Sequence, residues 1–245
     1  MWITVLVLIA VFVGSSLQRI TGMGFALVAA PFLVLLLGPI DGIILVNACA
    51  VVTAGLILPR VIRHVDWRRY AILASFALLG IIPGAVVVQH VPGAWLQVSI
   101  GALLAVALTV SVTLRRATLR DTIAVRAVSG AASGFMNATA GVGGPAVSMY
   151  AIATHWPQRA FAATMQPYFL TIAAASLVAK LTFGGADPPQ LTLTSWLLIA
   201  AACVAGLLLG ELLARVIEPR LARRMLVVIA YAGAVATIVR GITQL

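Results

Sequence analysis

Six hydrophobic stretches of this chain are each long enough to cross a lipid bilayer as a helix, which takes about 20 apolar residues. Short polar or arginine-bearing segments separate them, and no remaining segment is large enough to form a soluble domain. The pattern therefore predicts an all-α polytopic membrane protein with a single transmembrane domain over residues 1–245. The six predicted spans are residues 40–59, 70–89, 94–114, 158–183, 193–214 and 225–243.

Two further hydrophobic regions, 2–38 and 127–155, are interrupted by glycine-bearing breaks at corresponding places in the two halves of the chain. The first break is QRITGMGF at residues 18–25, and the second is NATAGVGGP at residues 137–145. Glycine and proline interrupt a helix and leave backbone N–H and C=O groups unpaired. Because lipid cannot satisfy such groups, the breaks must be buried in protein or line a cavity. Paired breaks of this kind are typical of the binding sites of secondary transporters.

Arginines cluster in three segments between hydrophobic stretches, as the positive-inside rule predicts for cytoplasmic loops. If all three are cytoplasmic, region 127–155 must begin and end on the cytoplasmic side. This region is short for two full spans, so we expect a re-entrant hairpin of two half-helices with its tip at residues 141–144. The three clusters lie within residues 60–69, 115–126 and 215–224.

The same argument places both ends of region 2–38 outside, either as a second hairpin or as two short spans. A hairpin followed by three spans in each half would make the halves inverted relative to each other. We therefore predict two homologous, inverted repeats, at about residues 1–114 and 127–245. An offset of 119 residues pairs Gly22 with Gly141, Gly24 with Gly143 and Asn47 with Gln166.

Composition agrees with a membrane protein, because 62% of the residues are hydrophobic and only 9% are charged, against about 25% charged in soluble domains. A net charge of +10 would suggest nucleic-acid binding in a soluble protein. Here the basic residues lie between spans, where they set topology beside anionic lipid. The lipid bilayer is therefore the expected partner, and nucleic acid is not.

Some features of the spans are expected to serve only helix packing. Glycines four residues apart, at Gly80 and Gly84 and again at Gly206 and Gly210, let neighbouring helices approach closely. The two cysteines lie in apolar stretches, so each is expected to be a small buried hydrophobe rather than part of a disulfide framework.

Arg19 lies in the first break, after a long run of mostly apolar residues. A charge deep in a bilayer costs about 3 kcal/mol, and no aspartate or glutamate occurs before Asp41, so Arg19 has no local carboxylate partner. A guanidinium suits a small oxyanion, which it can bind through two parallel hydrogen bonds. The alternative is that Arg19 snorkels to an interface or caps backbone carbonyls at the break.

The helix ends beside the breaks support an anion site. Half-helices that begin after Gly24 and Gly144 would point free N–H groups and the positive ends of their dipoles into the breaks. Hydroxyl and amide side chains, Gln18 among them, would add neutral hydrogen bonds, or else serve only to join helices. The predicted substrate-binding residues are Arg19, Thr21, Gly22, Gly24, Asn47, Asn137, Thr139, Gly141, Gly143, Gly144 and Gln166.

The other ionisable residues are expected to be structural. Glu211 and Arg215 have the i,i+4 spacing of a helical ion pair, Lys180 is expected to snorkel to the outer interface, and Asp41 and Asp187 to lie in loops. The three histidines lie near loops, so no metal site is expected. No Walker motif and no nucleophile–base pair is present, so the sequence predicts no cofactor, no catalytic residue and no enzymatic activity.

The broken segments resemble the two motifs of the TauE/SafE sulfite exporter family. The resemblance lies in residues 18–31 (QRITGMGFALVAAP), in residues 137–145, and in HWPQRA at residues 155–160. Length, repeat spacing and basic inner loops agree over essentially the whole chain. Many members have further glycines where Phe25 follows Gly24 here, which indicates a narrower first break. The resemblance implies a multi-pass permease of the bacterial inner membrane for small sulfur-containing anions, such as sulfite or organosulfonates.

The residues themselves leave other functions open. An ion-coupled importer of a small anion would share this scaffold, and a membrane subunit that transports nothing is a further alternative. Export of one negative charge from a negative cytoplasm gains about 2.3 kcal/mol per 100 mV, so an exporter needs no coupling ion. The sequence leaves open the substrate, the coupling ion and whether the chain forms a homo-oligomer.

Overall fold

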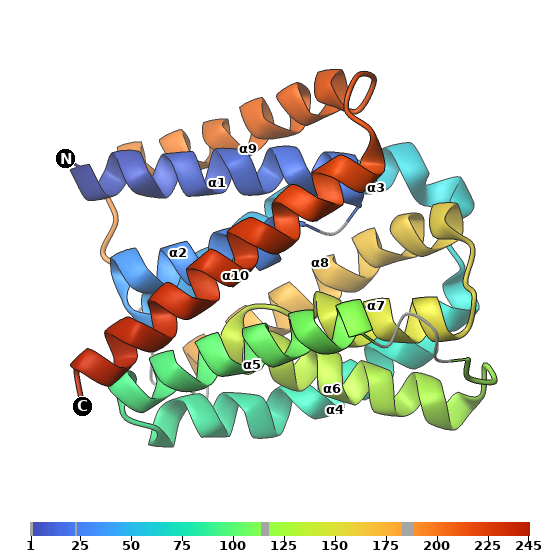
Figure 1. The fold of residues 1–245 in the computed structure, drawn as a ribbon, viewed down its shortest axis with the longest axis horizontal. Coiled ribbons are helices and arrows are strands. Elements are labelled where there is room, and N and C mark those ends of the chain that lie inside the picture. Colours follow the sequence, from blue (N-terminus) through green and yellow to red (C-terminus); the bar gives the residue numbers. More distant parts are fainter. Residues whose placement is uncertain (1, 23, 114–117, 183–188) are drawn as a thin grey trace.

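The computed structural model describes residues 2–22, 24–113, 118–182 and 189–245, and these residues form ten α-helices and one 3₁₀ helix. Asp187 and the arginines at 115 and 116 lie outside this range. Successive α-helices alternate in direction, and both termini lie at the same end of the molecule (Figure 1). The elements are α1 (Trp2–Thr21), α2 (Phe25–Leu37), α3 (Pro39–Val61), η1 (Ile62–His64), α4 (Trp67–His90), α5 (Gly93–Thr113), α6 (Ile123–Ala140), α7 (Gly144–Ala153), α8 (Gln158–Thr182), α9 (Leu193–Leu213) and α10 (Pro219–Thr243).

Seven of the described helices are long and apolar enough to cross a membrane, namely α1, α3, α4, α5, α8, α9 and α10. Six of them match the predicted spans, and the seventh, α1, is the first arm of the broken region 2–38. Its second arm, α2, is a shorter apolar helix of 13 residues. The all-α polytopic class is therefore confirmed.

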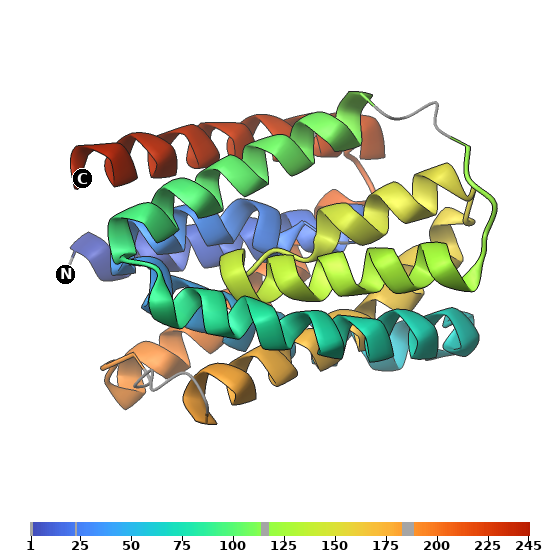
Figure 2. The ribbon, with the colours of Figure 1, turned by 90° about the horizontal axis from the view of Figure 1, so that it is seen from below.

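Each broken region folds back on itself as a helical hairpin (Figures 1 and 2). The hairpin of α1 and α2 has its base at the end of the molecule that carries both termini, whereas the hairpin of α6 and α7 has its base at the opposite end. In the second hairpin α6 ends at Ala140 and α7 begins at Gly144, as the sequence predicted. Insertion from opposite ends is what inverted repeats would produce, although the common origin of the halves stays a prediction.

The long arm of each hairpin packs against a span from the other half: α1 against α9, and α6 against α4. Glycines allow both approaches. A Cβ atom at Gly80 would lie 2.1 Å from the carbonyl oxygen of Ala131, and one at Gly210 would lie 2.5 Å from that of Ser16. The packing role predicted for these glycines is therefore confirmed. Helix α3 also packs against α8, and α5 packs against α10.

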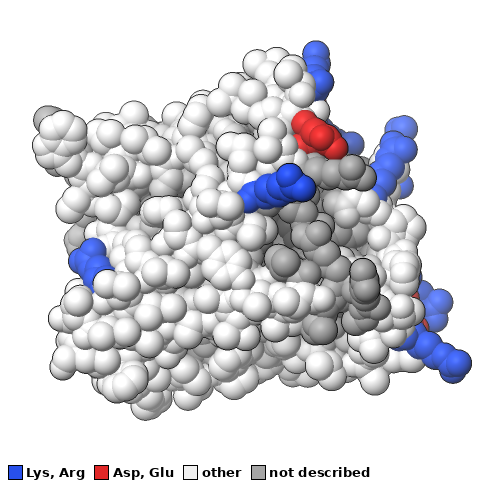
Figure 3. Space-filling model, in the orientation of Figure 1, with Lys and Arg blue, Asp and Glu red and all other residues white. Residues whose placement is uncertain are grey.

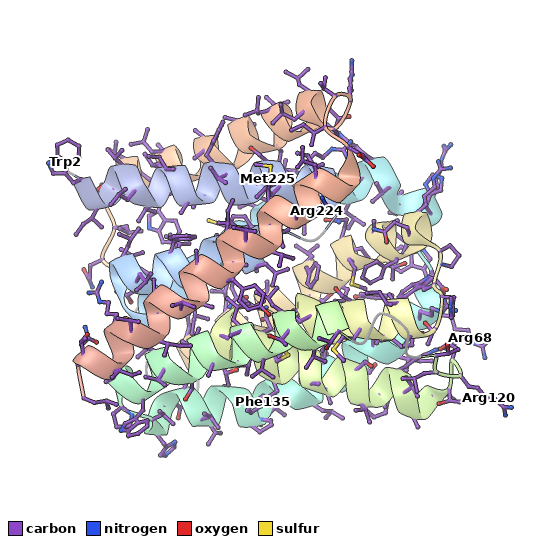
Figure 4. All side chains as sticks on the ribbon, in the orientation of Figure 1. Trp2, Arg68, Arg120, Phe135, Arg224 and Met225 are labelled. Carbon is purple, nitrogen blue, oxygen red and sulfur yellow. The ribbon has the colours of Figure 1, made fainter. Side chains whose placement is uncertain are left out.

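Arginines gather at the end of the molecule opposite the termini (Figure 3). Figure 4 shows Arg68 and Arg120 projecting from this end, whereas Trp2 lies at the other. Arg240, in the last turn of α10, is an exception at the terminal end, where its guanidinium donates to the carbonyl of Leu35. By the positive-inside rule we assign the arginine-rich end to the cytoplasm and name it the inner end, opposite the outer end.

Candidate functional site

The two breaks share one backbone conformation at the 119-residue offset. Gly22 and Gly141 have φ values of +86° and +72°, in the left-handed region that glycine adopts without strain. Each donates its N–H to the carbonyl four residues earlier, at Gln18 and Asn137 respectively. The chain therefore reverses by the same turn in both halves, as the paired glycines predicted.

Helices α2 and α7 begin at these turns, and no side chain of the described residues caps either N-terminus. The first-turn N–H groups of a helix have no intrahelical partner, and they carry the positive end of the helix dipole. Both N-termini contribute to a small pocket of about 30 Å³ between the breaks, which we call the central pocket. Because this volume holds one or two water molecules, the path between the breaks is nearly closed.

A larger cavity of about 1040 Å³, the inner cavity, adjoins the first break and extends toward the inner end. Basic side chains are prominent in its wall: Arg19 from α1, Arg60 and His64 from α3 and η1, and His155 and Arg159 near the start of α8. No aspartate or glutamate is among the described residues that line it. A concave surface of one sign raises the local concentration of the opposite charge, so this cavity attracts anions.

Gln18 lines both the inner cavity and the central pocket. Its side chain is buried, and its amide oxygen has no hydrogen-bond partner among the described residues. A buried polar group without a partner is rare and indicates a water or ligand nearby. The amide carries two donors as well as its oxygen, so Gln18 can bond an anion or a water that accompanies one. The sequence identified it only as one more amide, whereas its position places it between the two spaces.

Arg19 is not unpaired, contrary to the sequence-based expectation. Its Nε donates to Oε2 of Glu211 at 2.5 Å, and its Nη2 contacts the same oxygen. Nη1 of Arg60 lies 3.6 Å from that oxygen. One carboxylate beside two guanidiniums leaves a net positive charge, and a guanidinium has five N–H donors, so Arg19 keeps donors that can reach an anion. Glu211 therefore orients Arg19 without cancelling the charge of the cluster.

The expected ion pair between Glu211 and Arg215 is wrong. Helix α9 ends at Leu213, so the helical geometry that would bring residues four apart together does not extend to Arg215. Arg215 is exposed beyond the helix end, and Glu211 points instead toward Arg19 and Arg60. Asp41 also differs from expectation, because it lies in the first turn of α3 rather than in a loop.

Lys180 does not snorkel to the outer interface. Its side chain is buried, and its Nζ donates to the carbonyl oxygen of Ala138 at 2.6 Å. Helix α8 continues to Thr182 and packs against the end of α6, which covers the lysine. The C-terminal end of a helix carries partial negative charge, so the last turn of α6 favours a cation at this position.

Asn47 and Gln166 occupy matching positions in the two halves. Nδ2 of Asn47 donates to the carbonyl of Ile43 at 3.1 Å, and Nε2 of Gln166 donates to that of Ala162 at 3.0 Å. Nε2 of Gln166 also lies 3.2 Å from the carbonyl of Gly22, which ties α8 to the first break. Both amide oxygens are buried and lack a partner among the described residues.

The predicted site residues fall into three groups. Gly24 serves helix packing, because a Cβ atom there would lie 2.6 Å from Cδ1 of Leu226. Thr139 bonds back to its own helix at the carbonyl of Phe135, and Asn47 is fully buried. The substrate contacts themselves stay predictions. Arg19, Thr21, Gly22 and Gln166 line the inner cavity; Asn137, Gly141, Gly143 and Gly144 line the central pocket; Gly24, Asn47 and Thr139 line neither.

Comparison with known proteins adds one match. The family model described as Sulfite exporter TauE/SafE matches residues 6–237, a range that contains both breaks and every predicted site residue. The comparisons with curated proteins and with solved structures gave no match. The paired hairpins, the membrane-spanning helices and the extent of this match agree with one another. The chain belongs to the TauE/SafE sulfite exporter family of membrane transporters.

Proposed function

We propose that this protein exports a small sulfur oxyanion, such as sulfite or a small organosulfonate, across the bacterial inner membrane. The observation that carries the proposal is the inner cavity, which three arginines line and which no carboxylate of the described residues lines. The family supports sulfur-containing anions as the substrate class. Entry from the inner end follows from the position of the basic wall.

The anion would bind first in the inner cavity, beside Arg19. Glu211 holds the Arg19 guanidinium in one orientation, which lowers the entropy lost when an anion binds. Charge-assisted hydrogen bonds from a guanidinium to an oxyanion contribute about 1.5–3 kcal/mol. Arg60 adds a second positive charge at the same place.

From Arg19 the anion would pass Gln18 toward the uncapped N-termini of α2 and α7. Helix N-termini bind anions through their free N–H groups and their dipoles. The central pocket between them is too small for an oxyanion in this state, so the hairpins must separate before the anion passes. Rocking of one repeat against the other would achieve this separation.

Transport by purified protein in liposomes tests the proposal. We expect wild-type protein to release sulfite at a rate that rises with an outward-driving membrane potential, and Arg19→Gln to lower that rate at least about tenfold, from the hydrogen-bond energies above. Arg68→Gln is the matched control, because Arg68 carries the same charge at the inner end and does not line the cavity.

Two outcomes would contradict the proposal. If wild-type protein moves neither sulfite nor any organosulfonate, the substrate class is wrong. If the flux persists at a clamped voltage but collapses with an uncoupler, the protein is ion-coupled instead, as an importer on this scaffold would be.

A further inference from the structure

The repeat offset defines where a counterpart of the inner cavity would lie, toward the outer end. The 119-residue offset relates positions that line the inner cavity to positions in the other half of the chain. Gln18 corresponds to Asn137, Ile57 to Ser176, and Val61, next to Arg60, to Lys180. In the opposite direction Ala162 corresponds to Ile43 and Gln166 to Asn47. All five counterparts are buried.

Three of these counterparts are polar and lie together. Oδ1 of Asn137 accepts a hydrogen bond from the hydroxyl of Ser176 at 2.8 Å. Ser176 and Lys180 are one helical turn apart on α8, and Lys180 bonds the carbonyl of Ala138, next to Asn137. We call Asn137, Ser176 and Lys180 the outer seam. It begins at the central pocket, which Asn137 lines, and extends toward the outer end.

The charge of Lys180 is not neutralised by the described residues. Its side chain is 2% exposed, and no carboxylate in the described part of the chain lies within the 4.0 Å of an ion pair. Burying an ammonium costs several kcal/mol, and one carbonyl oxygen offsets only part of this cost. Packing alone would favour an apolar side chain here. The position therefore suits an anionic partner that is present during only part of a cycle.

An apolar cluster of buried residues lies toward the outer end. Val34, Ile43, Val88, Leu96, Ile100 and Ala140 form this cluster. They belong to the outer parts of α2, α3, α4 and α5 and to the tip of the second hairpin. In the described part of the chain, a large cavity thus lies toward the inner end and an apolar cluster lies toward the outer end. Alternating access between inverted halves would exchange these two conditions.

We propose that the outer seam is the closed half of the anion pathway, and that Lys180 binds the transported oxyanion when the outer end opens. This inference rests on the proposed export of an anion. On opening, the ammonium of Lys180 would exchange the carbonyl of Ala138 for an oxyanion oxygen. Ser176 and Asn137 would supply neutral donors. The outer site would then correspond to the inner cluster of Arg19 and Arg60.

Thiol labelling tests the pathway without requiring a known substrate. In a Cys49→Ala, Cys203→Ala background, Ser176→Cys and its counterpart Ile57→Cys would each be exposed to a membrane-impermeant, anionic methanethiosulfonate reagent from one face at a time. We expect Ile57→Cys to react from the inner face and Ser176→Cys from the outer face. Labelling accumulates over minutes, so a minor outward-open population suffices. Labelling of Ile57→Cys without any outer-face labelling of Ser176→Cys would overturn the proposal.

Sulfite efflux then tests Lys180 itself. We expect Lys180→Gln to lower efflux at least about tenfold, and Lys180→Arg, which keeps the charge, to retain most of it. Sulfite binding from the inner side should change less than about twofold in both variants, and gel filtration shows whether each is folded. Wild-type efflux by a folded Lys180→Gln would overturn the role of Lys180. If wild-type protein moves no sulfur oxyanion, the proposed function fails, whereas the labelling result still decides whether the outer seam is a pathway.

Discussion

The two breaks form the same backbone turn, but the first lies beside a large cavity and the second is buried. At the first, Arg19 borders a cavity of about 1040 Å³ that extends to the inner end. At the second, the corresponding residue is Ala138, whose carbonyl bonds the buried Lys180. The shared turn follows from glycines at matching positions, whereas the difference in access follows from how the helices around each turn are arranged. One structure therefore shows two conditions of the same element, one open and one closed.

The bases of the two hairpins are also held differently. At the inner end Asp121 accepts hydrogen bonds from Arg126 of α6, from Arg69 of α4 and from the hydroxyl of Tyr150 on α7. At the base of the first hairpin, at the outer end, the described residues form fewer such contacts. Arg240 of α10 donates a hydrogen bond to a backbone carbonyl of α2. We therefore expect the second hairpin to be the fixed part and the first to move against it.

Adding a methyl group where helices touch should have the largest effect, and it should affect both halves. We expect Gly80→Ala and Gly210→Ala each to destabilise the protein by about 3 kcal/mol, the upper end for overpacking, because the new Cβ would meet a backbone carbonyl at 2.1 Å and 2.5 Å respectively. Thermal unfolding in detergent measures this. Gly55→Ala is the control, since a Cβ there has nothing within 4 Å. If only one of the two contact variants is destabilised, the helix contacts of the halves are not equivalent.

Glu211→Gln should have the next largest effect, because it removes the group that orients Arg19 in the open half. We expect sulfite efflux to fall about tenfold, equivalent to about 1.4 kcal/mol. If Glu211 acts only through Arg19, the double variant with Arg19→Gln should be no slower than Arg19→Gln alone. Arg215→Gln, beyond the end of the same helix, should leave efflux unchanged. Additive losses in the double variant would show that Glu211 has a separate role.

The hydrophobic pattern predicted the spans and both breaks because these features are local. A run of apolar residues needs a lipid-facing helix, and a glycine such as Gly141 permits the left-handed turn that ends one. The arginines in the loops then predicted that the second hairpin begins and ends at the same side of the membrane. These parts of the fold depend on neighbouring residues, which a single sequence contains.

The contacts of Arg19 and Lys180 could not be predicted from the sequence, because they join residues that are far apart along the chain. Glu211 lies 192 positions from Arg19, and no periodic signal links two helices that far apart. The burial of Lys180 likewise depends on where the end of α6 lies, and helix composition does not specify which neighbour covers which face. A glutamate beside Gly210, in a helix that packs through that glycine, was the only local sign that its carboxylate faces protein.

Removing the amide from each break should separate stability from transport. Asn137→Leu removes the acceptor of the Ser176 hydroxyl in the closed half, so we expect a loss of about 1–2 kcal/mol in the free energy of unfolding. Gln18→Leu removes an amide whose oxygen has no partner in the described structure, so its stability should be unchanged while efflux falls. Thermal unfolding and sulfite efflux of both variants test this contrast. Equal destabilisation would show that Gln18 also serves a structural role.

A change to acidic pH should have the smallest effect on stability. We expect Asp121 to keep holding the base of the second hairpin down to pH 5. The hydrogen bond from Arg126, helped by Tyr150 and Arg69, holds the pKa of Asp121 well below its usual value. A lowered pKa in the folded state means that the stabilisation is complete above the unfolded pKa, about 3.9, and is lost only as pH falls through the folded value. We therefore expect the difference in melting temperature between wild type and Asp121→Asn to be a few degrees and constant from pH 8 to pH 5. If the difference in melting temperature shrinks between pH 8 and pH 5, the Asp121 carboxylate titrates within that range. The second hairpin would then be as free to move as the first, and the contrast between the two bases would not hold in acid.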